Sequence, residues 1–217
     1  MKRNLLVVCV LLVSLLGYGQ CPQEEIFLGS QADVDTFATN YPNCTQLFGL
    51  QLNGADINNL NGLSQITSIE NDLAIFGTSL QNLTGLNNLQ SIGNSFTVSF
   101  NQSLPNFNGL SQLTQIVIRM EVFSNNAMID FDGLQGLSNL GHLDIETSPA
   151  LESLKGLQGL ISTQGNIRIQ NSGISSLNGL NSLQFMDGRF EVRDCPNLSN
   201  LIALGNLQSV TGGFWIY

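Results

Sequence analysis

The sequence predicts a repeat solenoid, mainly parallel β with short helical turns and a helical cap before its first coil. Two observations predict it: a Gly-Leu dipeptide recurs every 23 or 24 residues, and apolar residues keep fixed offsets from this anchor. Seven units share the register, with Ala-Leu in the last. The anchors are Gly62, Gly85, Gly109, Gly133, Gly156, Gly179 and Ala203. A regular period of this length indicates structural units that stack to bury a shared core.

Apolar residues stand eleven and thirteen positions after each anchor, one position earlier in the fourth unit. Alternation with a period of two is typical of a half-buried strand. Leu50 and Leu52 extend the pattern upstream, so we expect eight parallel strands. The repeated pairs are Leu73/Ile75, Phe96/Val98, Met120/Val122, Leu143/Ile145, Ile167/Ile169, Phe190/Val192 and Phe214/Ile216.

The segments between the predicted strands are rich in leucine at a spacing of three and in Asn, Gly and Ser. The leucine spacing indicates a short turn that lays one face on the core. Asn101, Asn125, Asn171 and Asp194 lie at or near the same corner of successive units. Because Asn and Asp hydrogen-bond neighbouring backbone, we expect a stacked ladder that satisfies buried polar groups.

The charge composition excludes several classes of function. Only 11% of the residues are charged, and seven Lys or Arg stand against 16 Asp or Glu. Two of the seven, Lys2 and Arg3, lie in a predicted leader, so the remainder has a net charge near −11. Binding to nucleic acid or to anionic lipid needs clustered cations, so neither is expected. A single histidine also argues against chemistry built on histidine clusters.

Residues 1–19 have the pattern of a signal peptide. Lys2 and Arg3 precede a 12-residue apolar run from Leu5 to Leu16, and small residues place the cleavage after Gly19. The run is short for a bilayer span, and no other stretch approaches spanning length. The alternative, in which Cys21 is a lipoprotein cysteine, has a poor lipobox. We therefore expect an exported protein without a transmembrane helix, at the cell surface, at the outer membrane or outside the cell.

Residues 20–46 are predicted to form a disulfide-linked cap. Export permits disulfides, and Cys21 and Cys44 flank this small unit, which leaves Cys195 as a buried thiol. The run from Ser30 to Asp33 resembles a capping box, and Pro42 marks the end of a short helix. Residues 47–217 form the solenoid, for which the sequence shows no second cap. Either the chain continues into further C-terminal domains, which we favour, or the last strand pairs with a partner.

The stretch from Gln31 to Leu52, with its Asn-Cys-Thr segment at 43–45, is followed by repeated L-x-G-L-x-x-L units. Together they resemble the receptor L-domain-like leucine-rich repeats of insulin-receptor and epidermal-growth-factor-receptor ectodomains. The likeness is greater to exported versions common in Bacteroidetes such as flavobacteria. The resemblance covers nearly all of the mature chain and implies a single-stranded right-handed β-helix. It implies no catalytic residues.

The outward positions of the predicted strands form two rows, twelve and fourteen residues past each anchor. Exposed aromatic residues beside arginine are typical of contact surfaces for proteins, and aromatic faces with carboxylates also suit sugars. The alternative is a solvated face with weak cross-strand pairs, such as Arg168 with Asp144 and Glu191. The predicted binding face comprises Phe76, Glu121, Phe123, Asp144, Glu146, Arg168, Glu191, Arg193, Trp215 and Tyr217.

Other candidate sites have weaker patterns. Asp130 and Asp132 have the spacing that opens a calcium loop, but the loop lacks its closing Glu, and His142 has no metal partners at ligand spacing. We expect no catalytic residues, no metal and no cofactor. The predicted function is an exported, non-enzymatic module that binds a protein or glycan through the sheet. The alternatives are a structural spacer in a larger surface protein and, less favoured, a β-helix enzyme that degrades polysaccharides.

Overall fold

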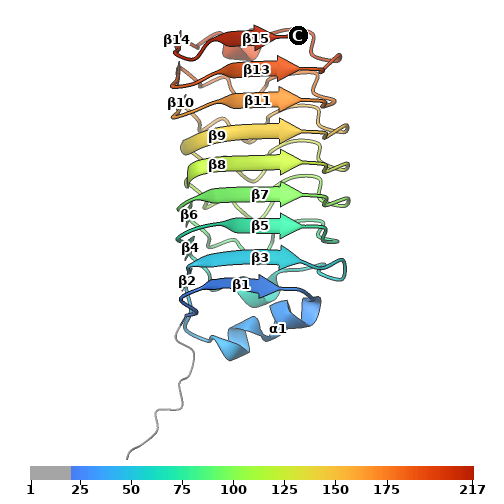
Figure 1. The fold of residues 1–217 in the computed structure, drawn as a ribbon, viewed down its shortest axis with the longest axis vertical. Coiled ribbons are helices and arrows are strands. Elements are labelled where there is room, and N and C mark those ends of the chain that lie inside the picture. Colours follow the sequence, from blue (N-terminus) through green and yellow to red (C-terminus); the bar gives the residue numbers. More distant parts are fainter. Residues whose placement is uncertain (1–20) are drawn as a thin grey trace, which may run out of the picture.

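The computed structural model describes residues 21–217 as a stack of coils, with one strand of each coil on the same broad face (Figure 1). All of the strand pairs are parallel, and consecutive coils pair residue for residue except at one register shift between Ile116 and Arg119 of β8. The strands of this face, in order, are β1 (Glu25–Leu28), β3 (Gly49–Asn53), β5 (Leu73–Phe76), β7 (Ser95–Ser99), β8 (Gln115–Phe123), β9 (Asn139–Glu146), β11 (Ile167–Gln170), β13 (Phe190–Arg193) and β15 (Phe214–Ile216). The predicted parallel solenoid is confirmed.

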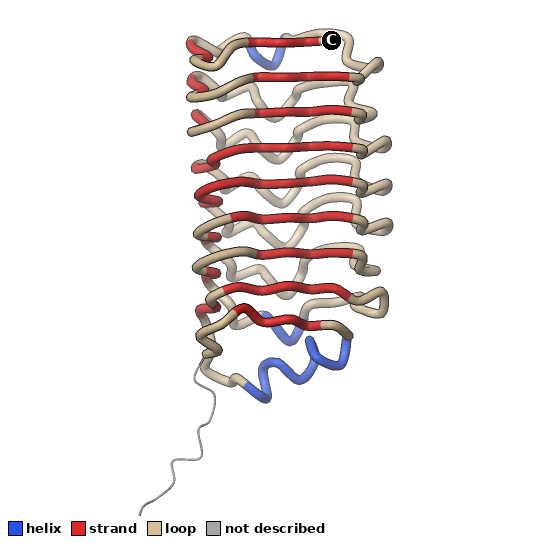
Figure 2. The backbone as a smooth tube through the Cα atoms, viewed as in Figure 1, coloured by secondary structure: helices blue, strands red, loops and turns tan. Residues whose placement is uncertain are grey.

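A second, narrower row of strands lies along one edge of this face (Figure 2). β8 and β9 belong to both rows because they run on from one to the other. The remaining members are β2 (Gln46–Leu47), β4 (Ser68–Ile69), β6 (Ser91–Ile92), β10 (Ser162–Thr163), β12 (Phe185–Met186) and β14 (Ser209–Val210). Sequence analysis missed this row, since two-residue strands are too short to show an alternation.

The core runs through the stack as columns of equivalent side chains. The residues two positions before and four positions after the anchors are fully buried from Leu60 to Leu183. Phe107 and Phe131 continue one column as rings whose centroids are 5.1 Å apart. The apolar strand pairs of the earlier coils are buried as well. The corresponding pair of the last described coil is Phe214 and Ile216, and each of these residues is 43% exposed.

The anchor glycines allow the coils to stack closely. Five of them, from Gly85 to Gly179, have φ between 106° and 117°, a region that L side chains rarely adopt. A Cβ at Gly109 would lie 2.2 Å from the carbonyl carbon of Leu83 in the preceding coil. The first and last units differ, because Gly62 and Ala203 lie in 3-10 helices, η1 (Asn61–Leu63) and η2 (Ile202–Leu204). This backbone explains why alanine can replace glycine in the last unit.

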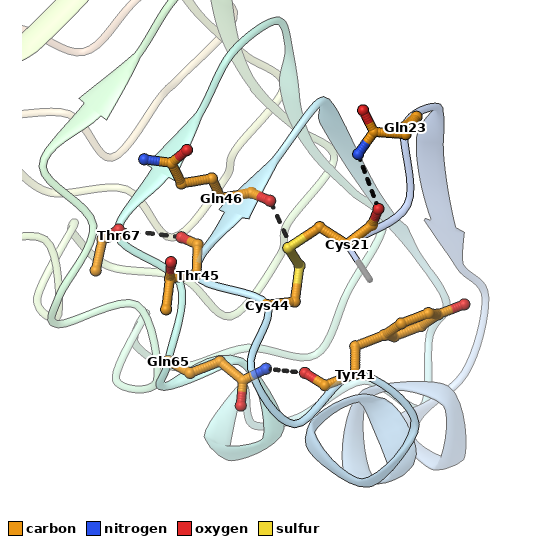
Figure 3. Close-up of a disulfide and its surroundings, with 8 residues drawn as sticks. All are labelled: Cys21, Gln23, Tyr41, Cys44, Thr45, Gln46, Gln65 and Thr67. Atoms are coloured by element: carbon orange, nitrogen blue, oxygen red, sulfur yellow. Dashed lines mark hydrogen bonds between the residues drawn. A yellow bond between two sulfur atoms is a disulfide. The ribbon is translucent and has the colours of Figure 1, made fainter. Parts of the chain in front are cut away.

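The N-terminal segment contains helix α1 (Gln31–Asn40), which lies across the end of the stack (Figure 1). Ser30 Oγ accepts the Asp33 N–H at 3.3 Å, the first bond of a capping box. The reciprocal bond is displaced by one residue, because Asp33 accepts the N–H of Gly29 at 3.0 Å and not that of Ser30. Val34 and Phe37 are buried against the first coil. The predicted Cys21–Cys44 disulfide is present (Figure 3).

One expectation for this segment was incomplete. β1 precedes the helix and pairs in parallel with β3, so the broad face has nine strands instead of the predicted eight. Ile26 and Leu28 are its only alternating apolar residues, and no Gly-Leu anchor precedes them. A strand this short is specified mainly by its partner, which is why the periodic pattern did not include it.

The predicted corner ladder is two adjacent columns instead of one. Asn101 and Asn125 are fully buried and belong to a column that continues through Ser148, Ser172 and Cys195. The residues one position earlier form the turn itself, each with φ between 50° and 60°. This turn column is Gly77, Phe100, Ser124, Thr147, Asn171 and Asp194. Asn171 and Asp194 therefore provide left-handed backbone and are not part of the buried ladder, which corrects the expectation.

Candidate functional site

The broad sheet face carries the side chains that the alternation had placed outward. The strand register brings the first predicted row together, with Glu121 beside Asp144, Arg168 between Asp144 and Glu191, and Glu191 beside Trp215. In the second row Phe123 lies beside Glu146, and Gln170 separates Glu146 from Arg193. Acidic, basic and aromatic groups thus lie within a few strands of one another.

A third row on the same face was missed by sequence analysis. It lies ten positions after the anchors, nine in the fourth unit, and contains Arg119, His142, Asn166 and Arg189. Several of its members accept a backbone N–H from the next coil, as Asn166 does from Arg189 at 2.8 Å. Counting positions from the anchors could have identified this row, because it stands two positions before the first row.

The first and third rows surround a hollow of about 170 Å³ on β8, β9, β11 and β13. Three guanidinium groups line it, each in contact with a carboxylate. Arg168 Nε lies 3.0 Å from Asp144 Oδ1, and Arg189 and Arg119 contact the carboxylates two residues further along their own strands. The full lining is Arg119, Asp144, Asn166, Ile167, Arg168, Arg189 and Glu191. We call this the arginine hollow.

The arginine side chains form the outer layer of the hollow and the carboxylates the inner layer. Those of Arg119, Arg168 and Arg189 are 43%, 46% and 52% exposed, whereas those of Asp144 and Glu191 are each 17% exposed. A molecule that approaches this part of the sheet therefore meets guanidinium groups first. The buried Nε of Arg119 has no hydrogen-bond partner; its nearest carboxylate oxygen, on Asp144, is 3.5 Å away.

Aromatic residues flank the arginine hollow on two sides. Toward β15, the Arg189 guanidinium lies over the Trp215 ring, 4.5 Å from its centroid. Toward β5, the rings of Phe76, Phe100 and Phe123 form a chain with centroid distances of 5.1 and 5.8 Å. Phe100 is in the turn column and was not among the predicted site residues.

One side chain of the second predicted row, fourteen positions after Gly85, is buried where an exposed side chain was predicted. Ser99 lies between Phe76 and Phe123 in the sheet register but is 1% exposed. The ring of Phe100, the next residue, contacts the rings of Phe76 and Phe123, the two larger side chains on either side of Ser99. Alternation identifies the direction of a side chain, whereas its exposure depends on the size of its neighbours.

A second hollow adjoins the first. It is lined by Glu121, Phe123, Asp144, Glu146 and Arg168, so Asp144 and Arg168 belong to both. At the far end of the face, Arg193 pairs with Asp194 at 3.1 Å, and Tyr217 is 71% exposed. The predicted residues from Glu121 to Glu191 are thus clustered, Trp215 contacts this cluster through Arg189, and Arg193 and Tyr217 lie beyond it.

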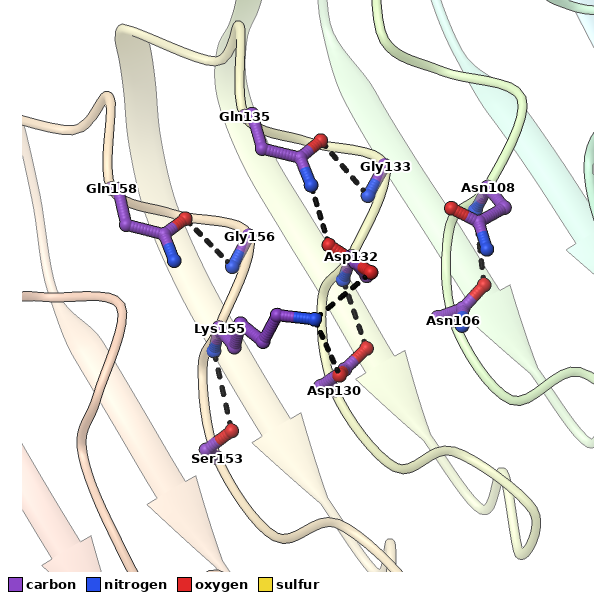
Figure 4. A network of polar contacts seen from close by, with 10 residues as sticks. All are labelled: Asn106, Asn108, Asp130, Asp132, Gly133, Gln135, Ser153, Lys155, Gly156 and Gln158. Carbon is purple, nitrogen blue, oxygen red and sulfur yellow. Dashed lines mark hydrogen bonds and ion pairs between the residues drawn. The ribbon is translucent and has the colours of Figure 1, made fainter.

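The acidic pair Asp130 and Asp132 has a structural explanation (Figure 4). Asp130 accepts the Asp132 N–H at 3.0 Å, as Asn106 does for Asn108 one coil earlier. Lys155 Nζ lies 3.0 Å from Asp132 and 3.8 Å from Asp130, and the hydrogen bond and charge of Asp132 raise the pKa of this lysine. A protein cation therefore already occupies the position between the two carboxylates.

Metal-binding and membrane-spanning features were also sought within residues 21–217. In that range no group of three or more His, Cys, Asp or Glu side chains is arranged to hold a metal ion. No helix there has both the length and the apolar character needed to cross a membrane. The predicted leader, residues 1–19, lies outside the described residues.

Comparison of the chain with protein-family models, with curated proteins and with solved structures finds no match.

Proposed function

We propose that this chain is an exported, non-enzymatic binding module that presents its broad parallel sheet to a glycan or protein at or beyond the cell surface. One observation carries the proposal. All four arginines of residues 21–217 lie on the broad face, in a chain whose mature form has a net charge near −11. Arginines that only kept the surface hydrated would be spread over the whole molecule, whereas arginines that bind a ligand are concentrated on one face.

The surroundings of these arginines support recognition. Arginine beside exposed aromatic rings is the combination enriched in interfaces, since guanidinium groups both hydrogen-bond and stack. Arg189 over Trp215 and Arg168 near Phe123 place both features next to the arginine hollow. The proposed export agrees with the leader pattern of residues 1–19 and with the Cys21–Cys44 disulfide, because disulfides persist in oxidising compartments.

The carboxylates of the face favour binding over hydrolysis. A glycosidase needs one carboxyl group that stays protonated to act as a general acid. Asp144 and Glu191 are each held by a guanidinium, at 3.0 and 3.3 Å, and are only 17% exposed, so neither is free to reach a glycosidic oxygen. If the chain is only a structural spacer, substitutions of the outward side chains should leave binding unchanged.

The test is a glycan array and a cell-surface pull-down with residues 20–217. The face variant is Trp215→Ala with Arg168→Gln, and the matched control is Phe185→Ala with Lys155→Gln. The control removes the same kinds of group from sites off the broad face. We expect binding to be lost in the face variant and kept in the control. Equal binding by all three proteins would favour another surface, and turnover of a bound polysaccharide would favour the enzyme alternative.

A further inference from the structure

We propose that the arginine hollow recognises the carboxylate of a sugar acid within an acidic polysaccharide. This inference rests on the proposed function, and it specifies the class of ligand. Its basis is the layered arrangement of the hollow, with three guanidinium groups outside and two carboxylates beneath them.

The guanidinium groups have hydrogen-bonding capacity to spare. An arginine carries five N–H donors in a fixed plane. Arg119, Arg168 and Arg189 each donate one side-chain hydrogen bond within residues 21–217, to Glu121, Asp144 and Glu191 respectively. The planar fork of a guanidinium matches a carboxylate bidentately, so the free donors suit an acidic group.

The charges around the hollow balance, so an anionic ligand is attracted only by direct contact. Its lining contains three guanidinium groups and two carboxylates, and Glu121, which contacts Arg119, brings the sum to zero, whereas the whole mature chain is strongly negative. The long-range field therefore repels polyanions, and attraction is confined to contacts within about 8 Å, the Debye length at physiological salt. Binding should then depend on direct pairing with the arginines rather than on general charge.

The composition of the hollow favours a sugar acid over an acidic peptide. Interfaces with peptides and proteins centre on buried apolar or aromatic anchors. The only apolar residue that lines this hollow is Ile167, whose side chain is fully buried. Asp144, Glu191 and the amide of Asn166 instead offer acceptors for hydroxyl groups. A uronic acid ring carries both the carboxylate and the hydroxyls that this mixture would bind.

The second hollow extends the site in the way that a polymer requires. It shares Asp144 and Arg168 with the arginine hollow and has the Phe123 ring in its wall. A sugar ring next to the bound acid can therefore lie against an aromatic side chain while its hydroxyls meet Glu121 or Glu146. The two hollows together form a continuous path across β8, β9 and β11.

The experiment measures binding of residues 20–217 to polygalacturonate by titration calorimetry. Three other polymers serve as comparisons. The fully methyl-esterified form shows whether binding needs the free carboxylate, and poly-glutamate shows whether an acidic peptide binds as well. Dextran sulfate shows whether any polyanion is sufficient. Arg168→Gln removes one guanidinium from the hollow. Lys155→Gln is the matched control, because it removes one positive charge from a site off the broad face and outside the hollow. Thermal unfolding of each variant checks that it is folded.

We expect polygalacturonate to bind and Arg168→Gln to weaken it about tenfold or more, the effect of one hydrogen bond to a charged group. The Lys155→Gln variant should bind as the parent does. Equal or tighter binding of the esterified polymer, poly-glutamate or dextran sulfate would overturn the proposal, and so would the absence of polygalacturonate binding. If the pull-down still depends on the face in that case, the proposed function stands and only the ligand class is wrong.

Discussion

The backbone N–H of Asn101 donates a 3.0 Å hydrogen bond to the side-chain oxygen of Asn125, one coil further along the stack. Asn125 also donates from Nδ2 to the Val98 carbonyl at 2.8 Å. Both asparagines are fully buried. Each therefore satisfies backbone groups that the corner would otherwise leave without partners, which ties two neighbouring coils together.

Replacement of Asn125 by alanine should destabilise the fold by about 3 kcal/mol. The change leaves the Asn101 N–H and the Val98 carbonyl buried without these partners, and each unsatisfied group costs roughly 1–3 kcal/mol. The measurement is the urea midpoint at constant slope. Asn126→Ala is the control, because Asn126 is exposed beside it and should change stability by less than about 0.5 kcal/mol. Equal effects of the two substitutions would refute the role of the ladder.

A methyl group at an anchor glycine should be far more harmful than one at a corner glycine. Gly109 and Gly77 both have positive φ, so alanine at either position costs about 1–2 kcal/mol of backbone strain. At Gly109 the new Cβ would also overlap the Leu83 carbonyl, whereas nothing lies within 4 Å at Gly77.

We therefore expect Gly77→Ala to fold with a modest loss, measured by thermal unfolding, and Gly109→Ala to lose several times as much or to fail to fold. Similar losses would mean that φ alone explains the anchor glycines.

Much of the fold could be predicted because each coil repeats the same physical requirements. Core positions at fixed offsets from Gly62 to Gly179 are buried as the alternation indicates. The shorter offset of the fourth unit also has a structural cause. A register shift between Ile116 and Arg119 gives β8 one residue more than β9.

The candidate site was predictable only in part. Outward direction follows from alternation, so Asp144 and Arg168 could be placed side by side from the sequence. Arg119 and Arg189 could not be assigned to the hollow in the same way. They stand one residue before the regular apolar pairs, and their contacts depend on how long side chains fold back over the sheet.

The free thiol of Cys195 should be protected and should make stability depend on pH. Burial raises its pKa above the ordinary value of 9.0. The folded state then keeps its proton while the unfolded state releases it, so this contribution to stability is lost as the pH rises past 9.0 toward the folded pKa.

The measurement is labelling by iodoacetamide together with the pH dependence of the urea midpoint. We expect slow labelling that accelerates on unfolding, and a loss of stability in alkali that Cys195→Ser removes. Labelling of the folded protein as fast as a small thiol would contradict this picture.

The stacking of Arg189 on Trp215 should control access to the tryptophan ring. Trp215 is the only tryptophan of the chain, so its fluorescence reports on the edge of the arginine hollow without interference. Arg189→Gln removes the guanidinium that covers the ring and should increase quenching by acrylamide. Arg193→Gln serves as the control, since Arg193 pairs with Asp194 instead. If both variants quench like the parent, the guanidinium does not shield the ring in solution.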